Sequence, residues 1–153
     1  MTRLEEMRRM AHEFMNHQYG ECDGEHDPPA IAVIELEDGQ GGLALLNGET
    51  HIAMKQMLAY DKLPSKIKQF CVAAPSWITL LNTETKSAER FEGVLFSSES
   101  PGVCEGHYSR LTRENGVNTL GPIAKLEGEA SGRLVKLLPT QQQEMKQWVP
   151  SEK

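Results

Sequence analysis

The first twenty residues carry apolar positions at the spacing of an amphipathic helix. Thr2 and Glu5 form a capping-box pattern, which places the start of a helix at the N-terminus. The apolar residues that follow recur every three or four positions: Leu4, Met7, Ala11, Phe14 and Met15. Gly20 is a suitable residue to end a helix. The pattern therefore predicts a helix from the N-terminus to the neighbourhood of Gly20.

Short apolar runs and turn residues alternate in the next part of the chain. Residues 30–36 are apolar on both faces of a strand, which indicates a central position in a sheet. A glycine-rich turn follows, and residues 43–46 form a short partner strand. Thr50 can cap a second helix that runs to Leu63 and is stopped by Pro64.

After Pro64 the pattern becomes one of strands. We predict strands over 67–74, 77–81, 90–97 and 103–112, with further strand candidates at 120–126 and 134–138. Strands with short connections usually form an antiparallel meander. Thr140 and Gln143 form a second capping box, which opens a C-terminal tail helix. We therefore expect one α+β domain over residues 1–153: an antiparallel, meander-type sheet, with the N-terminal and middle helices packed on one face.

Composition narrows the classes of function. A chain of 153 residues can bury a self-sufficient core. The net charge is −6, and the basic residues are scattered, which argues against direct binding of nucleic acid. Three cysteines do not make a disulfide framework. The opening residues include acids rather than a signal sequence, and no apolar run is long enough to cross a membrane, so we expect a cytoplasmic protein without a membrane partner.

One acidic loop holds possible metal ligands: Cys22, Asp23, His26 and Asp27. Thiolate and imidazole suit zinc, whereas carboxylates suit harder ions. A second pair of zinc ligands would have to come from Cys104 and His107, but residues three apart on a strand point to opposite faces. An acidic surface loop is the default interpretation, and the four loop residues are kept as candidate ligands.

Other motifs for catalysis or cofactor binding fail on spacing. His12 and His17 resemble the two ligands of a zinc protease, but five helical steps leave their rings about 140° apart. The glycines at 39, 41 and 42 lack the Lys-Ser/Thr of a phosphate loop and are typical of a hairpin turn. No nucleophile elbow is present in the sequence. The sequence thus predicts no cofactor and favours a protein that is not an enzyme.

Two tryptophans are candidate anchors for a partner. Trp77 stands at the head of a strand and suits either the core or an interface. Trp148, with Met145, lies in the predicted tail helix, where it docks on the chain's own core, docks on a second subunit or stays exposed. We take Trp77, Met145 and Trp148 as candidate interaction residues, and we expect a homo-oligomer, with a dimer as the simplest case, or another protein partner.

The middle of the chain resembles a group of small uncharacterised proteins of phages and prophage-bearing bacteria. The resemblance rests on the stretches FCVAAPSW at 70–77 and EGVLFSSE at 92–99, and extends faintly to residues 111–113. It implies no catalytic activity. The sequence therefore favours a non-enzymatic accessory or protein-interaction module of phage type. Two alternatives stay open: a small metal-binding protein or hydrolase that uses the Cys22–His26 loop, and an acidic inhibitor of a nucleic-acid-binding partner.

Overall fold

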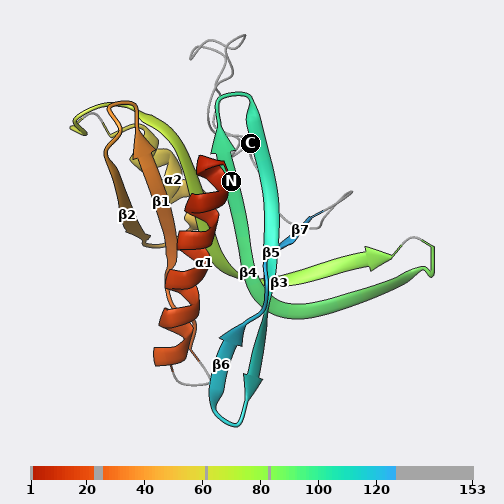
Figure 1. The fold of residues 1–153 in the computed structure, drawn as a ribbon. Coiled ribbons are helices and arrows are strands. Elements are labelled where there is room, and N and C mark those ends of the chain that lie inside the picture. The colour runs from red at the N-terminus through yellow and green to blue at the C-terminus, as the bar shows by residue number, and fades with distance from the viewer. Residues whose placement is uncertain (1, 23–25, 61, 83, 127–153) are drawn as a thin grey trace.

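The computed structural model describes residues 2–22, 26–60, 62–82 and 84–126, which form two helices and a seven-stranded antiparallel sheet (Figure 1). The elements in chain order are α1 (Arg3–Glu21), β1 (Ala30–Leu36), β2 (Gly41–Leu46), α2 (Thr50–Leu58), β3 (Ile67–Asn82), β4 (Ser87–Ser100), β5 (Val103–Glu114), β6 (Val117–Leu120) and β7 (Ala124–Lys125). The sheet order is β2-β1-β3-β4-β5-β6, and β7 also pairs with β5. The α+β class and the antiparallel sheet are therefore confirmed.

Helix α1 begins at the predicted capping box. The Thr2 hydroxyl accepts a hydrogen bond from the Glu5 backbone N–H at 3.1 Å, and the Glu5 carboxylate accepts one from the Thr2 N–H at 2.7 Å. The buried side of the helix follows the predicted apolar stripe and continues one turn further, to Tyr19. Neither described helix is long and apolar enough to span a membrane.

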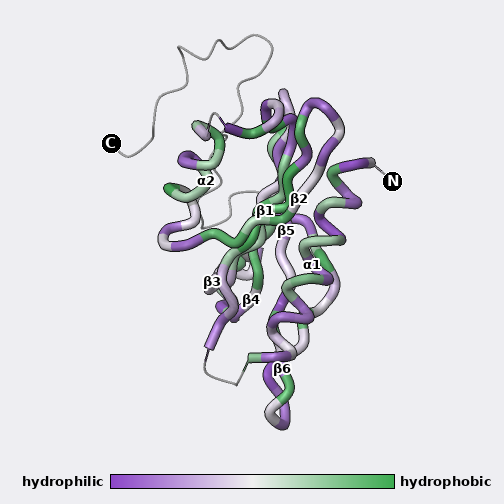
Figure 2. Tube along the Cα trace, turned by 90° about the vertical axis from the view of Figure 1, so that its left-hand side faces the viewer, coloured by the Kyte–Doolittle hydropathy of each residue, from purple (hydrophilic) through white to green (hydrophobic). Residues whose placement is uncertain are grey.

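The two helices cover opposite faces of the sheet. Consecutive residues of a strand point to opposite faces, and along β1 they divide between two apolar clusters. Ile31 and Val33 pack with α1, whereas Ala30 and Ala32 pack with α2. Figure 2 shows α1 on one side of the central strands and α2 on the other. This differs from the expected packing of both helices on one face, because β1 and β3 are apolar on both faces and each face needs a cover.

Several predicted boundaries also differ: the strand expected at 120–126 is divided between β6 and β7, β4 is longer than 90–97, and two further differences change the course of the chain. The segments 67–74 and 77–81 form one strand, β3, which passes through Pro75. The proline lies beyond Ala73, the last described residue of β3 that pairs with β1, so its missing N–H removes no bond to that strand. Helix α2 ends at Leu58 rather than Leu63, and Tyr60 just beyond it is exposed, so another helical turn would bury little. The predicted strand at 134–138 and the tail helix lie outside the described residues.

The distal parts of β3 and β4 form a two-stranded arm. Residues 77–82 of β3 pair with residues 87–92 of β4, and neither segment has a second neighbouring strand in the described part of the chain. In Figure 1 this arm extends away from the rest of the sheet. We call residues 77–82 and 87–92 the arm.

Candidate functional site

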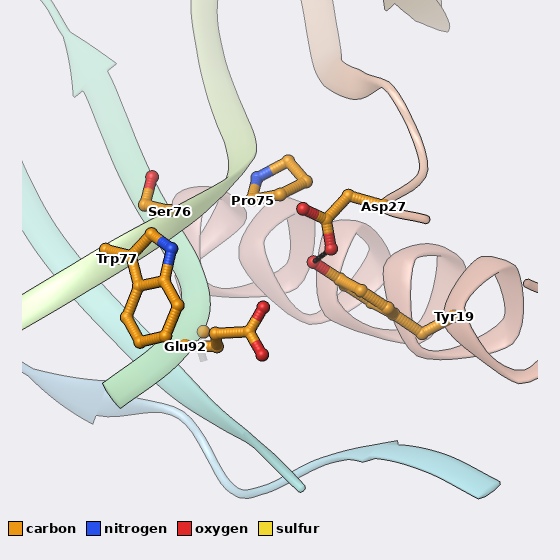
Figure 3. A pocket seen from close by; sticks show the side chains of 7 residues that line it. Tyr19, Asp27, Pro75, Ser76, Trp77 and Glu92 are labelled. Atoms are coloured by element: carbon orange, nitrogen blue, oxygen red, sulfur yellow. Dashed lines mark hydrogen bonds between the residues drawn. The ribbon is translucent and has the colours of Figure 1, made fainter. Parts of the chain in front are cut away.

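A small pocket lies at the base of the arm, where α1, the loop before β1 and strands β3 and β4 meet. Its volume is about 200 Å³, and it is lined by Tyr19, Asp27, Pro75, Ser76, Trp77, Glu92 and Gly93. Figure 3 shows the Glu92 carboxylate between Trp77 and the Tyr19–Asp27 pair. The pocket thus brings together one predicted metal ligand, Asp27, and one predicted interaction residue, Trp77.

Arg113 of β5 binds both carboxylates of the pocket. Its Nε donates to Glu92 Oε1 at 3.1 Å, and its Nη2 donates to Asp27 Oδ1 at 3.0 Å and to Glu92 Oε2 at 3.3 Å. The hydrogen bonds to Glu92, with the charge of Asp27, raise the pKa of the Arg113 guanidinium. The arginine therefore stays charged and ties the loop before β1 to strands β4 and β5.

Tyr19 forms the inner wall of the pocket. It lies in the last turns of α1, is almost fully buried, and donates from its hydroxyl to Asp27 Oδ1 at 3.2 Å. Burial, followed by the negative charge of Asp27, raises the pKa of the Tyr19 phenol. The phenol is therefore a protonated donor at neutral pH and does not serve as a base.

The side chains of the pocket do not form a nucleophile–base pair. The only hydroxyl besides Tyr19 among the lining residues is that of Ser76, which donates to the Ala74 carbonyl at 3.2 Å. Trp77 forms the outer wall, and the guanidinium of Arg90 lies 5.0 Å from the centre of its ring. The arrangement is suited to holding the arm in place and presenting an indole ring rather than to general acid–base chemistry.

The predicted metal ligands are dispersed. Cys22 is half-buried at the C-cap of α1, and its carbonyl accepts a hydrogen bond from Asn118 Nδ2 at 3.4 Å. His26 is exposed, Asp27 is bound by Tyr19 and Arg113, and Asp23 lies outside the described residues. Within the described ranges no three such ligands come together. Metal binding by this loop stays a prediction.

A second group of polar side chains lies between α1 and the sheet, buried except for the half-exposed Glu105. Arg8 donates from Nη2 to Glu105 Oε1 at 2.8 Å and from Nε to the Ser98 hydroxyl at 3.3 Å. The Ser98 hydroxyl in turn donates to Cys71 Sγ at 3.4 Å. Burial raises the pKa of the Cys71 thiol to about 11, which makes it a poor nucleophile at neutral pH. This group therefore has a structural role in fixing α1 on the sheet.

Exposed apolar side chains gather on two parts of the sheet. On the arm, Trp77 and Leu81 are 60% and 62% exposed. On the outermost strand β2, Leu43 and Leu45 are 46% and 57% exposed. Trp77 was predicted from the sequence as an interaction residue, and the other three were not, because their apolar character alone does not tell a buried from an exposed strand face. Met145 and Trp148 lie outside the described residues.

Three further residues of the pocket were not predicted from the sequence: Tyr19, Glu92 and Arg113. Tyr19 continues the helical stripe four residues after Met15, which was a usable signal for burial. Nothing in the local sequence links Arg113 to Asp27, 86 residues away, or to Glu92, 21 residues away on the neighbouring strand. Comparison with known proteins returned no matching family model, no related curated protein and no similar solved structure.

Proposed function

We propose that the protein is a non-enzymatic interaction module that binds a partner protein through the exposed face of the arm. The observation that carries this proposal is the position of Trp77 and Leu81, two large apolar side chains exposed on the same face of a projecting hairpin. Exposed aromatic and aliphatic residues grouped in this way are typical of the centre of a protein–protein interface.

The packing of the opposite face of the arm on the sheet supports the same proposal. There Ile78 and its cross-strand partner Phe91 are buried, and the ring of Phe91 lies 5.8 Å from that of Tyr108. The Arg110 guanidinium stacks over Phe91 at 3.8 Å and binds Glu89 at 2.9 Å. One face thus anchors the arm to the sheet, which an isolated two-stranded hairpin would need for stability. The other face is left available for a partner.

The charges around the exposed face indicate the chemistry of that partner. Arg90 lies over Trp77, and Glu92 is its cross-strand neighbour, so the apolar centre has one basic and one acidic group beside it. We therefore propose a folded protein partner with an apolar contact surface and a mixed polar rim, as in ordinary transient interfaces. An accessory role of the kind found in phages is part of this proposal.

Differential capture tests this proposal. The full-length chain is immobilised, and proteins retained from an extract of its native cells are quantified by mass spectrometry. We expect Trp77→Ala to lose the specific partner, with an affinity loss of roughly 30-fold for a central aromatic anchor worth about 2 kcal/mol. Val117→Ala is the matched control, because Val117 is 60% exposed but lies on β6.

Comparison with the Val117→Ala control shows which result supports the proposal and which contradicts it. A protein retained by the unmodified chain and by Val117→Ala but lost from Trp77→Ala supports the proposal, provided that circular dichroism shows Trp77→Ala to be folded. An identical set of retained proteins for all three chains contradicts it.

A further inference from the structure

We propose that the pocket at the base of the arm binds the ε-ammonium group of a lysine side chain that the partner protein presents. This inference deepens the proposed function and rests on it, because the lysine belongs to the protein that binds the arm. Trp77 lines the pocket and is also part of the exposed face of the arm. A partner that contacts this face therefore reaches the pocket directly.

The oxygen atoms of two carboxylates face the pocket. Asp27 uses Oδ1 to accept hydrogen bonds from both Tyr19 and Arg113. In Figure 3 its other oxygen points away from Tyr19, towards the side of the pocket that Trp77 forms. The Glu92 carboxylate lies beside the same space and is partly exposed. A group that donates hydrogen bonds can therefore reach both carboxylates from the pocket.

The charges around the pocket favour a monovalent cation. Asp27 and Glu92 carry two negative charges, whereas Arg113 supplies one positive charge, and one ammonium group balances the excess. A divalent metal ion fits less well, because Arg113 Nη2 lies 3.0 Å from Asp27 and 3.3 Å from Glu92 and repels it. Such an ion also needs more ligands, and among the described residues no three suitable side chains come together. The net charge of −6 attracts a basic partner over a longer range.

The hydrogen bonds already present favour lysine over arginine as the bound side chain. An arginine binds a carboxylate best when two of its N–H groups meet the two oxygens of that carboxylate. Both oxygens of Glu92 are already held in this way by Arg113. An ammonium group is instead a compact charge with three donors. It can therefore bind one oxygen of Asp27 and one of Glu92 without displacing Arg113.

The other walls of the pocket suit the methylene chain of a lysine. Pro75 and the indole of Trp77 provide apolar lining, and lysine side chains bury their methylene groups along such surfaces. Arg90 already lies 5.0 Å from the centre of the indole, so this ring accommodates a cation beside it. The volume of about 200 Å³ is below the roughly 300 Å³ at which pockets for small-molecule ligands begin. A single side chain therefore fits this pocket better than a free metabolite.

Binding of a free lysine derivative tests the pocket by itself. The probe is Nα-acetyl-lysine methylamide, titrated into the ¹⁵N-labelled full-length chain. The signal is the indole N–H resonance of Trp77, which Trp77→Phe distinguishes from that of Trp148. We expect a saturable shift with a millimolar dissociation constant, because one partly exposed ion pair contributes little. Nα-acetyl-norleucine methylamide, which lacks the ammonium group, should cause no such shift.

Asp27→Asn is the variant that should lose this binding. The asparagine keeps an oxygen that accepts from Tyr19 and Arg113, but it replaces the oxygen that faces the pocket with an amide donor. Glu89→Gln is the matched control, because Glu89 also binds an arginine, Arg110, but lies on the opposite face of the arm. Its titration should match that of the unmodified chain. No shift with the lysine probe, or an equal shift with the norleucine probe or in a folded Asp27→Asn chain, overturns the inference.

The same two variants, used in the capture experiment, test whether the lysine belongs to the partner. Asp27→Asn should weaken binding of the Trp77-dependent partner roughly tenfold or more, whereas Glu89→Gln should leave it unchanged. Equal binding by both variants overturns the assignment to the partner, while the proposed function of the arm stands. If no captured protein depends on Trp77, the proposed function fails together with that assignment, and the titration alone decides whether the pocket binds an ammonium group.

Discussion

Burial of His107 beneath α1 couples the stability of this fold to pH. The His107 ring is nearly inaccessible to solvent, and its Nδ1 makes no hydrogen bond within the described part of the chain. Burial, followed by the positive charge of Arg8, lowers the pKa of His107 below its usual 6.5; Lys125 acts in the same direction, whereas Glu105 and Glu5 oppose it. His107 therefore binds a proton less readily in the folded chain than in the unfolded chain.

The sign of the pH effect follows from this lowered pKa. The stability linked to His107 is complete above the unfolded-state pKa and is lost as pH falls from that value to the lowered pKa of the folded state. We expect the midpoint of urea unfolding to drop between about pH 8 and about pH 5, and His107→Gln to show a shallower drop. His17→Gln, at an exposed site on α1, is the control. Equal slopes for His107→Gln and the unmodified chain would contradict the account.

Gly93 allows β4 and β5 to approach closely beside the pocket. A Cβ atom at this position would lie 2.3 Å from the carbonyl oxygen of Ser109, closer than two such atoms can come. We expect Gly93→Ala to lower the free energy of unfolding by about 1–3 kcal/mol, the usual cost of overpacking. Urea denaturation measures this. Gly42→Ala, where a Cβ meets no atom within 4 Å, should leave stability nearly unchanged; equal stabilities for the two variants would show the contact to be unimportant.

The residues of the pocket show where sequence reasoning stops. Trp77 and Asp27 were both selected from the sequence, for different roles, yet nothing predicted that they line one pocket. Arg113 of β5 contacts Asp27 in the loop and Glu92 in the arm, and these contacts depend on the complete sheet. His12, set aside as a zinc ligand on its helical spacing, is half-buried, and its Nε2 lies 2.7 Å from the carbonyl oxygen of Gly121, a contact that the local sequence does not indicate.

At the scale of elements, the local sequence patterns predicted those helix and strand bounds that local interactions determine. The bounds of β1 agree with the apolar run at 30–36, and α1 begins where the capping box indicates. The local sequence could not show that two predicted strands join into β3. Pro75 is tolerated within this strand because the pairing with β1 ends before it, which only the complete sheet reveals. The helices lie on opposite faces because β1 is apolar on both. The sequence showed these two apolar faces, but both helices were nevertheless expected on one face.

The capping box of α1 makes a prediction at this scale. Thr2→Ala removes the side-chain acceptor for the Glu5 N–H, and we expect a loss of about 1 kcal/mol in the free energy of unfolding. Thr2→Ser retains the hydroxyl and should keep most of that stability. Chemical denaturation of the two variants measures the difference. Equal losses for both would mean that the cap contributes nothing through its hydroxyl.

At the scale of the whole molecule, the central strands are covered on both faces, whereas the arm and the edge strand β2 are not. Helices α1 and α2 close the two faces of β1 and β3, while the arm and the β2 edge keep apolar side chains exposed. Local propensity does not explain why apolar side chains are exposed on the arm and on β2, and each of these surfaces is suited to contact with another molecule. The resemblance of the middle of the chain to phage proteins stays a prediction, although its two stretches include Trp77 and Glu92 of the pocket.

Photo-crosslinking in native cells from position 81 tests the central claim most directly. A photoreactive amino acid replaces Leu81 on the exposed face of the arm, and a second chain carries it in place of Val117 as a control of equal exposure. We expect a discrete adduct from position 81 that disappears with Trp77→Ala, and no such adduct from position 117. The absence of an adduct from position 81, or an adduct unaffected by Trp77→Ala, would contradict the proposal that the arm binds a partner.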